Sequence, residues 1–202
     1  ELRQEILNKF PKFGNDDDTV DSYTVKLANR FIEETHHQSP IKYEPEGYNR
    51  VLFPTIYTLQ KATDMGRVTA ASADGRMEGE TISENQSPTY GAPEKGPTAM
   101  LNSIAKLPLE ETPGGGFNFT LQKQFLGGED GADRLAQLIN GYFANNGLHM
   151  QIMVTDEKEL EDAMEHPEKH RNLVVRVTGF SAYFVVLTED VQREVINRIK
   201  SA

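Results

Sequence analysis

Apolar residues recur at intervals of three and four in three stretches of the chain, which is the spacing of one face of a helix. The stretches contain Val20, Tyr23, Leu27 and Phe31; Ala132, Leu135, Leu138, Ile139, Tyr142 and Phe143; and Val191, Val195 and Ile199. They predict helices over about residues 18–36, 132–143 and 189–200. Shorter helices are expected around 99–105 and 157–164, the second with Thr155 or Asp156 as its N-cap.

Runs of β-branched and aromatic residues predict strands over about 51–57, 149–154, 173–177 and 181–187. The last two runs are joined at Thr178-Gly179. A glycine at that place fits an ordinary hairpin or β-bulge, and the local residues alone favour this interpretation. Residues 38–130 are rich in Gly, Pro, Ser and Asn, which predicts long loops. Loops of such length in a compact domain tend to be functional.

The charge of the chain narrows its possible partners. It has 202 residues with 21 Lys and Arg against 31 Asp and Glu, and its net charge of −10 argues against a nucleic-acid or anionic-membrane partner. No apolar run reaches the roughly 18 residues of a transmembrane helix. The first residues, Glu1 to Glu5, do not resemble a signal peptide. We therefore expect a cytoplasmic protein.

The candidate metal ligands do not have the spacing of a known site. Residues 16–18 are three aspartates at the start of the first helix, where carboxylates cap free amides, and they lack the glycine and closing glutamate of a calcium loop. His166 and His170 are four residues apart, with Pro167 between them and no third ligand at suitable spacing. We expect no bound metal. The chain has no cysteine, which excludes disulfides and a cysteine nucleophile of its own.

Several segments occur in an order that resembles one known family. They are Pro11-Lys12-Phe13-Gly14-Asn15-Asp16-Asp17-Asp18, Ala70 to Arg76, Ser87-Pro88, Gly96-Pro97-Thr98-Ala99, Gly147 with His149 and Gln151, His166 to Lys169, and Asn172 to Val177. They lead into Arg176-Val177-Thr178-Gly179-Phe180-Ser181-Ala182-Tyr183-Phe184, which is similar to the radical-bearing loop of the glycyl radical enzymes. The resemblance covers essentially the whole chain. It is to the dehydratase and lyase branch of the pyruvate formate-lyase-like superfamily, except that Ala73 replaces the usual proline.

The resemblance implies that Gly179 stores an unpaired electron on its Cα. Such a radical is delocalised over the two flanking peptide units, which requires a flat centre that a Cβ would crowd, so only glycine is suitable. By the same resemblance Arg176, Val177, Phe180 and Ser181 belong to the loop that an activating enzyme recognises. The whole radical loop would span about residues 173–187.

The implied fold is α/β, namely the C-terminal part of a ten-stranded barrel with the glycine loop between two strands and a C-terminal helix. Residues 1–202 would form one glycyl radical domain. Phe117, Asn118, His149 and Gln151 are implied as residues of the substrate pocket, although a plain turn before a strand explains the first two equally well. Part of a barrel leaves strand edges and apolar faces exposed. We therefore expect a partner or an oligomer.

The implied mechanism divides the chemistry between several proteins. An activating enzyme, which holds an iron–sulfur cluster and cleaves S-adenosylmethionine, removes one hydrogen from Gly179 under anaerobic conditions. The spin passes to a cysteine thiol, and the thiyl radical starts cleavage of a small-molecule substrate. Because the chain has no cysteine, the thiol must come from a partner segment or subunit. The chain is then a lyase or dehydratase only together with that partner.

Three interpretations follow, in the order in which we favour them. The first is the radical-carrying C-terminal portion or subunit of a glycyl radical enzyme. The second is a stand-alone module that restores an oxygen-cleaved enzyme, which is a binding role. The third is an α/β domain whose glycine turn only mimics the motif. Residues 179–184 resemble the dehydratase branch more than the formate-lyase branch, and the chain is longer than a minimal replacement module needs to be.

Overall fold

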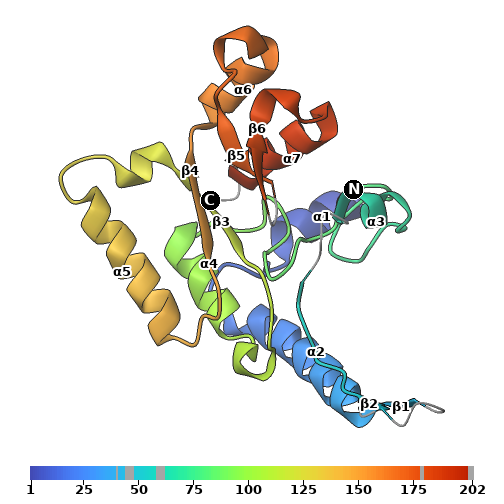
Figure 1. The fold of residues 1–202 in the computed structure, drawn as a ribbon. Helices are drawn as coiled ribbons and strands as arrows, with labels where there is room; N and C mark the ends of the chain where they lie inside the picture. The colour runs from blue at the N-terminus through green and yellow to red at the C-terminus, as the bar shows by residue number, and fades with distance from the viewer. Residues whose placement is uncertain (40, 44–47, 58–61, 178–179, 200–202) are drawn as a thin grey trace.

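The computed structural model describes residues 1–39, 41–43, 48–57, 62–177 and 180–199. Its helices are α1 (Leu2–Lys9), α2 (Asp18–His37), α3 (Ala62–Arg67), α4 (Gly96–Ala105), α5 (Gly131–Ala144), α6 (Glu157–Glu165) and α7 (Glu189–Ile199). Its strands are β1 (Ile41–Tyr43), β2 (Tyr48–Arg50), β3 (Asn118–Gln122), β4 (Gln151–Thr155), β5 (Val174–Arg176) and β6 (Ser181–Tyr183). Figure 1 shows their arrangement. Four 3₁₀ turns complete the described part: η1 (Leu109–Glu111), η2 (Lys123–Leu126), η3 (Pro167–Lys169) and η4 (Phe184–Val186).

The five helices predicted from the sequence are confirmed as α2, α4, α5, α6 and α7. Asp17 caps α2, because its side chain accepts a hydrogen bond from Thr19 N at 2.9 Å. Asp156 caps α6 in the same way, through Lys158 N at 2.9 Å. The short helices α1 and α3 were not predicted, because neither is long enough to show a regular apolar stripe.

The described strands form three separate pairs: β1–β2 and β5–β6 are antiparallel, and β3–β4 is parallel. The strand predicted at 51–57 is wrong. These residues make only an isolated bridge between Ile56 and Gly115, and Phe53 is exposed, with no core to pack against in the described part of the chain. The strand predicted at 181–187 is too long: it ends at Tyr183, because Phe184 turns into the core and η4 begins there.

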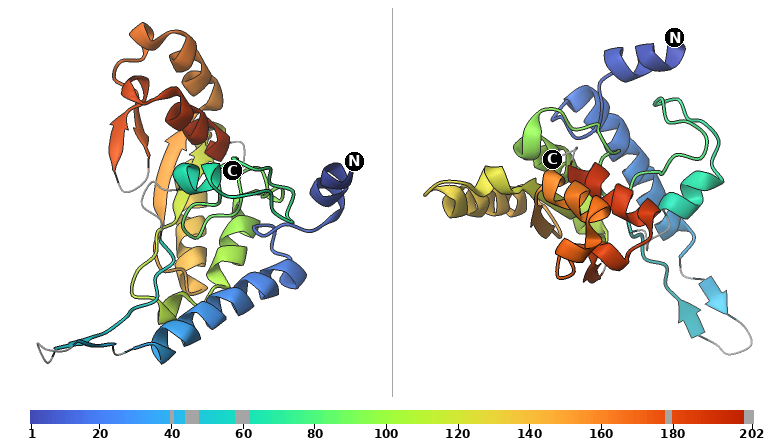
Figure 2. Two further views of the ribbon diagram at one scale, coloured as in Figure 1. Left: turned by 90° about the vertical axis from the view of Figure 1, so that its right-hand side faces the viewer. Right: turned by 90° about the horizontal axis from the view of Figure 1, so that it is seen from above.

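Two hydrophobic cores hold the described elements together. The first joins α2, α4, α5 and β3 and includes Met100, Ile104, Phe117, Phe119 and Tyr142. The second joins α6, β5, η4 and α7 and includes Leu160, Val175, Phe184, Val195 and Ile199. Figure 2 shows the elements of the second core gathered at one end of the β3–β4 pair. Residues 156–199 thus have a core of their own and follow directly from β4.

Polar contacts also link α7 to the segment of residues 62–90. Arg67 Nη2 lies 2.5 Å from Asp190 Oδ2. Thr63 Oγ1 donates to Glu194 Oε2 at 3.0 Å, and Tyr90 Oη donates to Glu194 Oε1 at 3.4 Å. Hydrogen bonds and an ion pair are therefore part of what fastens residues 156–199 to this segment.

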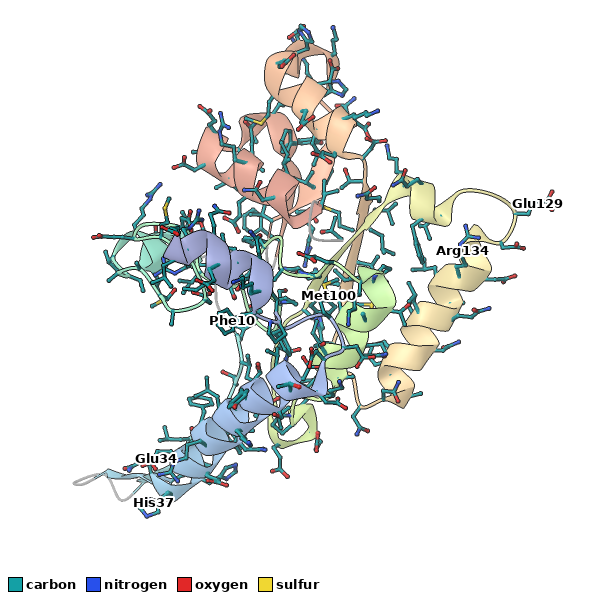
Figure 3. All side chains as sticks on the ribbon, turned by 180° about the vertical axis from the view of Figure 1, so that it is seen from behind. Phe10, Glu34, His37, Met100, Glu129 and Arg134 are labelled. Carbon is teal, nitrogen blue, oxygen red and sulfur yellow. The ribbon has the colours of Figure 1, made fainter. Side chains whose placement is uncertain are left out.

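The apolar stripe that predicted α2 is not the face that α2 buries. Tyr23, Leu27 and Phe31 are 68%, 72% and 49% exposed, whereas Ala28 and Ile32 are buried. Figure 3 shows α2 extending from the body. The chain exposes 12,227 Å², about a quarter more than the roughly 9,500 Å² expected for a compact monomer of its size. This excess agrees with the expectation of a partner. No helix in the described part of the chain is long and apolar enough to cross a membrane.

Candidate active site

The predicted radical loop connects β5 and β6. The two strands pair in the register Val174 with Tyr183, Val175 with Ala182, and Arg176 with Ser181. Val177 N then donates to Phe180 O at 3.0 Å, so the chain reverses direction between these two residues. Thr178 and Gly179 themselves lie outside the described residues. The flanking strands therefore form an antiparallel hairpin, as the local sequence pattern allowed.

The hairpin has one buried and one open face. Val175 and Val177 are 1% and 5% exposed and belong to the second core. On the open face the cross-strand partners Val174 and Tyr183 are 53% and 51% exposed, and Phe180, just before β6, is 43% exposed. Large apolar side chains thus lie uncovered beside the loop.

The four residues expected to contact an activating enzyme differ in accessibility. Phe180 and Ser181 are exposed, Arg176 is half-buried and Val177 is buried. Arg176 Nη1 donates to Ser181 Oγ at 3.2 Å across the hairpin, and Arg176 N donates to Met153 Sδ on β4 at 3.2 Å. Arg176 therefore connects the hairpin to β4.

A cavity of about 230 Å³ lies where the end of β5 meets the starts of β3 and β4. Its side chains are Tyr57, Asn85, Asn118, His149, Gln151 and Arg176. Three of the four predicted pocket residues, Asn118, His149 and Gln151, thus line one cavity, and they do so together with Arg176. Tyr57 and Asn85 were not predicted as site residues.

Phe117, the fourth predicted pocket residue, lies in the first core instead. It is fully buried, and its ring centroid is 5.6 Å from that of Phe119 and 6.1 Å from that of Tyr142. Side chains alternate along a strand, so Phe117 and Phe119 share the face opposite to Asn118. The alternation in this segment was the signal that could have assigned Phe117 to the core.

Two glycines allow the walls of the cavity to approach one another. A Cβ at Gly115 would lie 2.1 Å from Gln86 Nε2, and a Cβ at Gly116 would lie 3.1 Å from the ring of Tyr57. Gln86 N also donates to Gly116 O at 3.3 Å. Gly115 and Gly116 therefore allow the segments around residues 57 and 86 to approach closely.

A buried carboxylate supports the cavity wall. Glu84 is 2% exposed, and its Oε1 accepts a hydrogen bond from Asn118 Nδ2 at 3.1 Å. Asn85, the next residue, has a left-handed backbone conformation with φ of 52°. Glu84 fixes the orientation of the Asn118 amide, while Arg176 brings a positive charge to the cavity.

Within the described part of the chain, one group of carboxylates lies close enough together to hold a cation. Oxygens of Asp16, Asp18 and Asp21 lie within 4.8 Å of one another, but Lys106 Nζ donates to all three at 2.7, 2.7 and 2.8 Å. Although desolvation opposes it, hydrogen bonding to the carboxylates raises the pKa of Lys106 above its ordinary value. Hydrogen bonds from Lys106 and Asn102 lower the pKa of Asp16. The lysine ammonium thus occupies the position between the three carboxylates in which a cation would bind.

Comparisons with known proteins identify the family. Residues 82–185, about half of the chain, match the family described as "Glycine radical", and residues 1–60 match "Pyruvate formate lyase-like". The chain is 35% identical over 202 residues to "Probable dehydratase YbiW" of Escherichia coli (strain K12), covering 98% of this chain and 25% of that protein. It is also 35% identical over 202 residues to "PFL-like enzyme TdcE" of the same strain, covering 96% and 26%.

A solved structure agrees with these sequence matches. The B12-independent glycerol dehydratase from Clostridium butyricum, in its glycerol-bound form, superposes with a TM-score of 0.86 at 35% identity, covering 98% of this chain and 24% of that one. The chain spans about a quarter of the length of each of these proteins. The expected α/β fold, as a portion of the glycyl radical enzyme barrel, is confirmed. By the match of residues 82–185, which contain the β5–β6 hairpin, the chain belongs to the glycyl radical enzyme family.

Proposed function

We propose that Gly179 carries the stored radical of a dehydratase-type glycyl radical enzyme and that this chain supplies its radical loop. The observation that carries the proposal is the hairpin itself. Val177 and Phe180 are hydrogen-bonded across the reversal, and Arg176, three residues before Gly179, lines a polar cavity. The loop therefore starts beside a volume in which a small molecule can bind.

The thiol that receives the spin comes from a cysteine-bearing segment or subunit, because the chain has no cysteine. We propose that this partner covers the exposed apolar side chains of the hairpin, Val174, Phe180 and Tyr183. Covering them buries apolar surface and excludes water and dioxygen from the loop. The match of residues 1–60 to the pyruvate formate lyase-like family favours an enzyme portion over a minimal replacement module.

The substrate in this proposal is a small hydroxylated molecule from which water is eliminated. A cavity of about 230 Å³ is smaller than the roughly 300–1,000 Å³ of sites for drug-sized ligands. Its amide, imidazole, phenol and guanidinium groups suit hydroxyl groups better than an apolar ligand. Two of the similar proteins are a probable dehydratase and a glycerol dehydratase, which supports the reaction class.

Activation requires that a radical-SAM activating enzyme reach Gly179. We propose that residues 156–199 move away as a unit, since they have their own core and follow β4 through one connection. Movement would break the contacts of Asp190 and Glu194 with residues 62–90. Arg176, Phe180 and Ser181 would then be available to the activating enzyme, whereas Val177 belongs to the second core and would stay buried within the moving unit. The iron–sulfur cluster and S-adenosylmethionine belong to that enzyme.

Electron paramagnetic resonance tests the proposal. The chain is incubated without oxygen with S-adenosylmethionine, a radical-SAM activating enzyme and a cysteine-bearing partner. We expect a doublet from the single remaining Cα hydrogen in the wild type and none in Gly179→Ala. Gly141→Ala, in the last turn of α5 where a Cβ meets nothing within 4 Å, is the matched control and should keep the doublet. A doublet that survives in Gly179→Ala contradicts the assignment.

A further inference from the structure

The hydrogen-bond ladder between β3 and β4 ends in an unusual way at the cavity. The register pairs Asn118 with Gln151, and Gln151 N donates to Phe117 O at 2.8 Å. In a parallel pair the next bond back along the ladder runs from Phe117 N to His149 O. In this structure Phe117 N donates instead to Nδ1 of the His149 side chain, at a distance of 3.4 Å.

The carbonyl of His149 has a different partner. Tyr142 Oη donates to His149 O at 3.3 Å. Tyr142 is 2% exposed, and burial raises its pKa to about 12, so the hydroxyl keeps the proton with which it donates. The Tyr142 hydroxyl thus donates to the carbonyl that the ladder would otherwise use, and the His149 ring is the acceptor for Phe117 N.

The turn before His149 is built to hold this arrangement. Gly147 N donates to Tyr142 O at 3.0 Å. A Cβ at Gly147 would lie 2.3 Å from the Tyr142 ring, so only glycine lets the chain pass so closely over the tyrosine. Both the backbone and the ring of His149 are therefore positioned by groups of the first core.

We propose that His149 is held as the Nε2–H tautomer and donates a hydrogen bond to an oxygen of the ligand in the cavity. Phe117 is fully buried, and its N–H needs an acceptor. A ring nitrogen that accepts a hydrogen bond carries no proton, so the proton of the neutral ring is on Nε2. The inference rests on the proposed role of the cavity as the substrate site.

A fixed donor sets the kind of ligand group that fits. Asn85, Asn118 and Gln151 carry amides, which both donate and accept hydrogen bonds. His149 in this tautomer and Arg176 only donate. The cavity therefore selects ligands that present at least two oxygen acceptors, such as vicinal hydroxyl groups or a carbonyl beside a hydroxyl. Nδ1 is already engaged, which excludes proton abstraction by that atom.

The tautomer can be measured on the 202-residue chain without activation. In the ¹⁵N-labelled protein near neutral pH, long-range ¹H–¹⁵N correlation spectra distinguish the protonated from the unprotonated ring nitrogen, and His149 is assigned by loss of its signals in His149→Gln. We expect one form, with the proton on Nε2. A proton on Nδ1, or an equal mixture of the two forms, overturns the proposal. The result does not depend on radical formation, so its failure is distinguishable from failure of the proposed function.

Two isosteric variants separate the two nitrogens. His149→Asn places an amide oxygen near the position of Nδ1 and removes the Nε2 donor, whereas His149→Gln places its amide near Nε2. We expect the Phe117 amide to exchange with solvent at the wild-type rate in His149→Asn and at least tenfold faster in His149→Gln. Equal rates in both variants contradict the geometry. Titration of the wild type with glycerol should shift the Nε2–H proton, and no shift at saturating glycerol contradicts binding of a ligand oxygen.

Discussion

Lys106 is the clearest place to test the energetics of the fold, because its ammonium group donates hydrogen bonds to three carboxylates. Lys106→Met keeps the length of the side chain and removes the charge. Loss of one partner from a buried ion pair costs about 3–5 kcal/mol, and loss from an exposed pair costs about 0–1 kcal/mol. Lys106 is 30% exposed, Asp21 is 1% exposed and Asp18 is 93% exposed. We expect a loss of about 2–3 kcal/mol in the free energy of unfolding, mainly from the buried Asp21 charge.

Urea unfolding followed by circular dichroism measures this loss. Asp18→Asn is the control and should change the free energy of unfolding by less than about 0.5 kcal/mol. Hydrogen bonding to Lys106 lowers the pKa of Asp16 in the folded state. The stabilisation of the folded state by the Asp16 carboxylate is therefore present above the unfolded pKa of about 3.9. It is lost as the pH falls through the lowered pKa of the folded state. The difference between wild type and Lys106→Met should shrink on acidification. A loss no larger than that of Asp18→Asn at pH 7 would show that Lys106 does not stabilise the buried Asp21 carboxylate.

Three further predictions concern other contacts. Gly147→Ala, whose Cβ would overlap the Tyr142 ring at 2.3 Å, should destabilise the chain by about 1–3 kcal/mol in urea unfolding; wild-type stability contradicts the close contact. Glu194→Gln should speed amide exchange across residues 156–199 more than elsewhere, and a uniform change argues against a separable unit. The pKa of Asp162 is lowered mainly by the hydrogen bond from His170. Removing it in His170→Ala should return that pKa to its ordinary range in a carboxyl NMR titration, and an unchanged pKa contradicts the pairing.

The helices were the most predictable part of this chain. The helix predicted at residues 18–36 is present as Asp18–His37, because Asp17 supplies the cap and the apolar spacing is regular. The same spacing did not reveal which face is buried. Tyr23, Leu27 and Phe31 look like core positions, yet they are exposed in this chain. Periodicity records that a face is apolar, and the identity of what covers it is a tertiary property.

The strands were less predictable because pairing depends on distant partners. Residues 51–57 have strand-like composition but lack a neighbouring strand in the described structure, whereas β3 pairs with β4, about 30 residues later in the chain. Short apolar runs do not distinguish a strand from a 3₁₀ turn, which is why η4 was predicted as part of β6. The strand predicted at 149–154 begins two residues later, at Gln151.

The cavity could be predicted only in part. Resemblance to the family suggested Asn118, His149 and Gln151, which come together on the β3–β4 pair. Tyr57 and Asn85 reach the same cavity from segments 33 or more residues earlier in the sequence than Asn118, and no local pattern marks them. The adjacent Gly115 and Gly116 are the signal that was available, because paired glycines often mark a close approach between segments.

The central claim is that the radical resides on Gly179. Its most direct test is electron paramagnetic resonance of the activated complex, prepared once with ordinary glycine and once with glycine deuterated at Cα. A radical on Gly179 gives a doublet in the first sample that collapses to a narrow single line in the second, with neither signal in Gly179→Ala. A signal whose shape is unchanged by deuterated glycine, or that persists in Gly179→Ala, contradicts the assignment to Gly179.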